Sequence, residues 1–76
     1  MPPELRGLTE RELEVFGLIA RGLSNDEIAA HLTVSKATVK THVNRVITKL
    51  DSRTQPQLVV LAYESGWARP GDTESA

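Results

Sequence analysis

The sequence predicts an all-α fold, a single domain of four helices, and two observations lead to that prediction. Apolar residues recur every three or four positions, as on one face of a helix, and they do not alternate with the period of two that a strand shows. Polar residues that commonly cap helices precede each of these apolar runs. The 76 residues have the size of one domain, whose small core can give only modest stability.

The first helix is expected over residues 10–21. Thr9 and Glu12 have the spacing of a capping box, in which each side chain accepts a hydrogen bond from the other residue's backbone N–H. Gly22 supplies the conformationally permissive residue that commonly follows a helix end. The apolar positions between these signals recur at helical spacing: Leu13, Phe16, Ile19 and Ala20.

A second, short helix is expected over residues 25–32, because Ser24 and Glu27 repeat the capping-box spacing. Only three residues, 33–35, separate it from the next apolar run, and this turn contains no glycine. Ser35 is placed to cap the helix that follows.

The third helix is expected over residues 36–50. Its apolar residues form one narrow stripe at positions i, i+4, i+7 and i+11, which predicts a core-facing side: Val39, Val43, Val46 and Leu50. The opposite side carries small or polar residues, flanked by Lys40 and Arg45: Ala37, Thr41, Asn44 and Thr48.

A fourth helix is expected to start after Thr54, with Gln57 as its capping-box partner, and to end near Ser65. Its run 58–63 is too apolar all round for a helix with one buried side. We expect Leu58, Val59 and Ala62 to face the core. Four other residues form a second stripe along the helix, which is expected to pair with the same stripe of another copy in a homodimer: Gln57, Val60, Leu61 and Glu64. A fully buried helix without a partner is the alternative.

These elements define one domain over residues 8–67. Residues 1–7 are expected to form a flexible leader, and residues 68–76, with Pro70, Gly71 and small polar residues, a flexible tail.

The distribution of charge is more informative than its sum. The formal net charge of −1 taken alone argues against a nucleic-acid ligand. Residues 28–50, however, contain no Asp or Glu and hold all of the following: His31, Lys36, Lys40, His42, Arg45 and Lys49. A cationic segment on an otherwise neutral body is typical of a focused phosphate-binding surface. A basic helix face that is merely solvated is the alternative.

A short helix, a tight turn and a longer helix with a basic outer face form a helix-turn-helix pattern. In this arrangement the second helix is the recognition helix and enters the major groove. Asn44 can form a bidentate pair with adenine, and Lys40 can reach guanine O6 and N7. Thr38, in the first turn, can contact a phosphate.

Four segments in fixed order also resemble a known family: LTERE at 8–12, GLSNDEIA at 22–29, SKATVKTHV at 35–43 and KL at 49–50. They resemble the LuxR-type, or GerE-like, helix-turn-helix domain, which is the output domain of NarL/FixJ-type bacterial response regulators. The departures come mainly after residue 50, where Asp51 and Gln55 replace a small residue and an arginine that are common in the family.

The resemblance implies that helix three reads double-stranded DNA and that helix four is the dimerisation helix of a homodimer on paired half-sites. It implies base contacts from Lys40, Thr41 and Asn44. Contacts to the DNA backbone are expected from four residues: Lys36, Thr38, Arg45 and Lys49. An amino-terminal receiver domain and RNA polymerase are further partners that the resemblance implies.

Other functions fit less well. Region four of a sigma factor shares similar segments but usually finishes near the recognition helix, and a protein-interaction module on the same scaffold is the other alternative. Neither an enzyme nor a metal or cofactor site is expected, because His31 and His42 lack metal partners at useful spacing and the serines occupy caps or loops. Without cysteine or a long apolar segment, the chain is expected to be cytoplasmic and independent of membranes.

Overall fold

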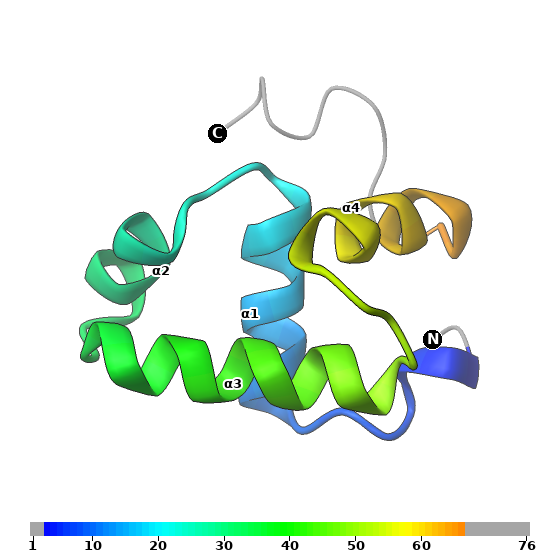
Figure 1. The fold of residues 1–76 in the computed structure, drawn as a ribbon, viewed down its shortest axis with the longest axis horizontal. Helices are drawn as coiled ribbons and strands as arrows, with labels where there is room; N and C mark the ends of the chain where they lie inside the picture. The colour runs from blue at the N-terminus through cyan, green and yellow to red at the C-terminus, as the bar shows by residue number, and fades with distance from the viewer. Residues whose placement is uncertain (1–2, 67–76) are drawn as a thin grey trace.

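The computed structural model describes residues 3–66, and this part of the chain is entirely helical (Figure 1). A short 3₁₀ turn precedes four α-helices: η1 (Pro3–Leu5), α1 (Glu10–Ala20), α2 (Asn25–Leu32), α3 (Lys36–Lys49) and α4 (Gln55–Glu64). The predicted all-α class and the order of the four helices are therefore confirmed. Trp67 and the predicted tail 68–76 lie outside the described residues.

Both predicted capping boxes are present. The Thr9 N–H donates to Glu12 Oε1 at 2.9 Å while the Glu12 N–H donates to Thr9 Oγ1 at 3.1 Å. Ser24 and Glu27 make the same reciprocal pair at 2.8 and 3.2 Å. The bond from the Ser24 N–H holds the pKa of the Glu27 carboxyl below its usual value. These local bonds fix where α1 and α2 begin.

The expected capping box of α4 was wrong. Thr54 makes no side-chain cap bond, and Gln57 Oε1 instead accepts from the N–H of Arg53 at 2.7 Å. In a capping box the Thr54 hydroxyl would accept from the N–H of Gln57, and this bond is not formed. The Gln57 side chain therefore closes the turn one residue earlier than the pattern predicted.

The helix pair α2–α3 turns on a residue with an unusual backbone. Thr33 has φ 57° and ψ 47°, in the left-handed region, and the N–H of Val34 donates to Ala29 O at 3.0 Å. This closes the end of α2 and reverses the chain within three residues, as in a helix-turn-helix. In Figure 1, α3 lies across the central helix α1, with α2 at one end and α4 on the other side.

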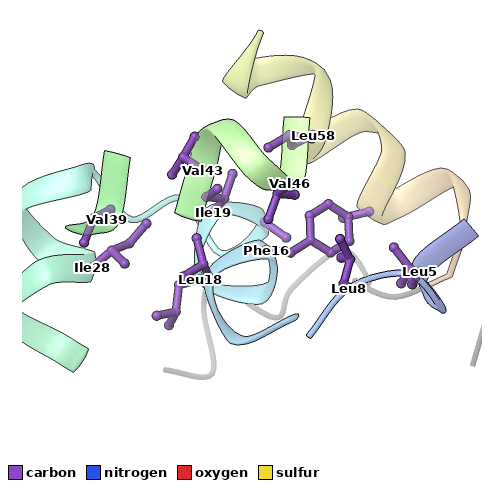
Figure 2. Close-up of a cluster of buried hydrophobic side chains, with 13 residues drawn as sticks. Leu5, Leu8, Phe16, Leu18, Ile19, Ile28, Val39, Val43, Val46 and Leu58 are labelled. Carbon is purple, nitrogen blue, oxygen red and sulfur yellow. The ribbon is translucent and has the colours of Figure 1, made fainter. Parts of the chain in front are cut away.

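The core forms where α1 meets α3, α2 and α4 (Figure 2). The predicted stripe of α3 points into it: Val39, Val43 and Val46 are at most 4% exposed, and Leu50 is half-buried. Leu5 is fully buried as well, so the core begins before the expected domain start at residue 8. The segment around Leu5 has no helical periodicity, which is why sequence alone did not place it in the core.

Helix α4 packs on the core with the residues that were predicted to face it. Leu58 and Ala62 are fully buried and Val59 is partly buried, whereas Val60 is 55% exposed. A helix buried all round, the alternative considered from the sequence, is excluded by the exposure of Val60.

Candidate nucleic-acid interface

The side of α3 that faces away from the core presents an open hollow. Its volume is about 340 Å³, and it is lined by Thr41, Asn44, Arg45, Thr48 and Lys49. Thr41 and Asn44, two of the three predicted base readers, therefore share one surface. Lys40, the third, is exposed but is not part of this lining.

Hydroxyl groups near the start of α3 are engaged with their own helix. Thr41 Oγ1 donates to the carbonyl of Ala37 at 3.1 Å. Ser35 Oγ accepts from the N–H of Thr38 at 3.1 Å and lies 2.9 Å from the Thr38 hydroxyl. The predicted cap of α3 by Ser35 is thus confirmed. Because the hydroxyl groups of Thr38 and Thr41 already bond within the helix, they have fewer hydrogen bonds to offer a ligand.

Two of the four cations on α3 are paired within the domain. Lys36 lies 2.9 Å from Asp26 of α2, with both side chains more than half exposed. Lys49 lies 2.7 Å from Glu12 of α1. Within residues 3–66, Lys40 and Arg45 make no ion pair. The free positive charge of α3 is therefore concentrated in the middle of the helix, beside the hollow.

Lys49 was predicted to contact phosphate, and within the domain its ammonium is paired with Glu12. Glu12 is 2% exposed, and the hydrogen bond from Lys49 is the largest cause that holds the pKa of this carboxyl below 4.5. A buried carboxylate needs this cation, so Lys49 serves the structure of the domain. Sequence reasoning missed Glu12 as a functional partner, although its i, i+4, i+7 spacing to Phe16 and Ile19 placed it on the buried stripe.

His42 lies at the edge of the core. Its side chain is half-buried, and Nδ1 is buried without a hydrogen-bond partner among the described residues. Within residues 3–66, no group of three or more His, Cys, Asp or Glu residues is arranged to hold a metal ion, and no helix there is long and apolar enough to cross a membrane.

The four predicted dimer residues also come together on one surface. Gln57, Val60, Leu61 and Glu64 line a hollow of about 510 Å³ between the end of α3 and α4. We call this the α4 surface. Its other lining residues are Leu50, Asp51 and Ser52. Gln55, one of the departures from the family pattern, donates from Nε2 to Asn25 Oδ1 at 3.1 Å and so connects α4 to α2.

Comparison with known proteins agrees with this architecture. Residues 6–62 match the family described as "Bacterial regulatory proteins, luxR family". The chain is 48% identical over 58 residues to the uncharacterized transcriptional regulatory protein YxjL of Bacillus subtilis. It is 46% identical over 57 residues to the response regulator protein VraR of Staphylococcus aureus and of Staphylococcus epidermidis.

These alignments cover 75–76% of this chain but 27% of each relative, so the chain spans about a quarter of the length of the curated relatives it matches. The family match covers the capped helices, the glycine-free turn and α3 with its exposed face, in the order in which the structure has them. This chain belongs to the luxR family of bacterial regulatory proteins.

Proposed function

We propose that this chain is the DNA-binding part of a bacterial transcriptional regulator and binds double-stranded DNA in a sequence-specific manner. The observation that carries the proposal is the outer face of α3. Thr41 and Asn44 share an open hollow there, and Lys40 and Arg45 beside them have no ion-pair partner within residues 3–66. A single helix with such a face fits the width of the major groove.

In this proposal the residues of α3 divide into two groups. Lys40, Thr41 and Asn44 contact base edges, because they project from the exposed side of the helix that would face the bases. Lys36, Thr38 and Arg45 contact the DNA backbone and set the register. Lys49 belongs to the second group as well, since its side chain is 39% exposed and lines the hollow although its ammonium is paired with Glu12.

We further propose that the domain binds as a homodimer through the α4 surface, with two half-sites about one helical turn apart. The exposed Val60 at its centre and the polar Gln57 and Glu64 at its edges support a small interface between identical surfaces. We propose a DNA-binding domain over residues 8–67, as expected from the sequence, and the burial of Leu5 supports including the segment just before it.

The relatives indicate a wider context. VraR is named a response regulator, and both relatives extend well beyond the matched segment. We propose that this domain serves the same kind of regulator in the bacterial cytoplasm, with a receiver domain and RNA polymerase as partners, and that it carries no catalytic activity.

Selection of binding sites from random double-stranded DNA tests the central proposal. An inverted repeat recovered from the pool would establish binding, sequence preference and two-fold symmetry together. Its affinity should fall steeply with salt, since cations on α3 would displace counterions from phosphates. Recovery of no preferred sequence at low salt would overturn the proposal.

A further inference from the structure

The chemistry of Thr41 is restricted by its own helix. Its hydroxyl donates to the carbonyl of Ala37, one turn earlier, at 3.1 Å. The single hydroxyl hydrogen is therefore not available to a ligand, although the oxygen can still accept. Thr41 is an exposed residue and lines the hollow that also contains Asn44 and Thr48, so its γ-methyl group is the apolar group that it can offer to a ligand there.

The major groove offers one apolar group to such a side chain. Of the four bases only thymine carries a methyl group there, at C5, and a threonine methyl is among the groups that contact it. Asn44 stands three residues from Thr41, about 5–6 Å between Cβ atoms on a helix. Successive base pairs are about 3.4 Å apart along each strand. A thymine in contact with Thr41 would belong to the pair that Asn44 reads or to its neighbour.

We propose that Thr41 selects thymine by contact of its γ-methyl group with the thymine C5-methyl, beside an adenine that pairs with Asn44. The inference rests on the proposed function and deepens it, because it specifies A·T base pairs as the ligand of this part of α3. It also assigns the selectivity to the methyl group of Thr41 rather than to the hydroxyl.

The experiment compares duplexes that differ by one methyl group. The sequence recovered by selection is prepared with each thymine of a half-site replaced in turn by deoxyuridine, which keeps base pairing and removes only the C5-methyl. At one position the parent should bind the uracil duplex about fourfold more weakly, the change expected for loss of one buried methyl group.

Two variants of Thr41 separate the methyl from the hydroxyl. Thr41→Val keeps a methyl at this position and should retain the preference for thymine over uracil. Thr41→Ser keeps the hydroxyl and should bind both duplexes equally. Thr48→Ser makes the same change elsewhere in the hollow and should leave the preference intact. Circular dichroism and thermal unfolding check that each variant is folded.

The outcomes distinguish the two proposals. Failure to recover any preferred sequence would overturn the proposed function and this inference together. A preferred sequence in which every thymine tolerates uracil would overturn the inference alone. It would also be overturned if Thr41→Ser kept the preference, if Thr41→Val lost it while remaining folded, or if Thr48→Ser removed it.

Discussion

Lys49, the last residue of α3, is bound to Glu12 in the first turn of α1, with Nζ 2.7 Å from Oε1. The same carboxylate oxygen accepts the N–H of Thr9 at 2.9 Å. Glu12 is buried, while the Lys49 side chain remains 39% exposed. One carboxylate therefore caps α1 and holds the end of α3 against it.

Removal of this cation should destabilise the fold. Lys49→Ala leaves the buried Glu12 carboxylate without its partner and should cost about 1–3 kcal/mol in the free energy of unfolding, measured by urea denaturation. Lys36→Ala is the matched control, since it removes an ion pair whose two side chains are mostly exposed, and it should cost less than about 1 kcal/mol. Equal costs for the two variants would contradict a structural role for Lys49.

The stability of the domain should fall in acid through Glu12. Its pKa in the folded state is below the ordinary 4.5, so its contribution is present above that pH and is lost as the pH falls through the folded pKa. Thermal unfolding between about pH 6 and pH 3 should show the parent approaching Glu12→Gln as the pH falls. Because the pKa of Glu27 is also lowered, Glu27→Gln is measured separately. A constant difference between parent and Glu12→Gln would contradict this assignment.

Replacing Thr33, in the turn between α2 and α3, with glycine should stabilise the domain. Thr33 is β-branched, exposed and held at φ 57°. Thr33→Gly relieves the clash of Cβ with the backbone, and this gain exceeds the entropy that glycine loses on folding, so the variant should be more stable by about 0.5–1 kcal/mol. Gly22→Ala is the converse case at φ 90°, where an added Cβ meets no neighbour within 4 Å. It should cost about 1–2 kcal/mol through backbone strain. A loss of stability in Thr33→Gly would show that the threonine side chain has a stabilising contact.

Substitution of the proposed base-contacting residues should weaken DNA binding without changing the stability of the domain. Lys40→Ala and Asn44→Ala should each weaken binding to the selected site by about 1–3 kcal/mol while the thermal midpoint changes little, because both side chains are exposed. Val43→Asp is the contrasting change, since it places a charge at a position 4% exposed and should unfold the domain. If both alanine variants bind every sequence as the parent does, α3 is not the reading helix.

Dimerisation through the α4 surface should appear as cooperativity on paired half-sites. Val60→Glu with Leu61→Lys should remain folded, occupy one half-site weakly and lose cooperative binding to two. Leu61 is half-buried, so the double variant could unfold the domain. Val60→Glu alone is therefore measured as well, because Val60 is 55% exposed and its substitution should leave the domain folded. Cooperative binding by folded Val60→Glu that equals the parent's would remove this surface from the proposal.

The sequence by itself determined the local features of this protein. Capping residues act over three positions and the apolar stripe over three and four, so Thr9, Ser24 and Val43 could be assigned without knowledge of the fold. The one capping box predicted wrongly is that of Thr54 and Gln57, where the Gln57 side chain bonds to the backbone of Arg53 instead.

Only the tertiary structure decided which charges of α3 are free. Glu12 and Lys49 are 37 residues apart, and they meet because α3 crosses α1, a geometry that no local pattern contains. The burial of Leu5 has the same origin. The local sequence around a helical lysine or arginine does not show whether its side chain faces a carboxylate or solvent, because the partner that determines its role comes from another part of the chain.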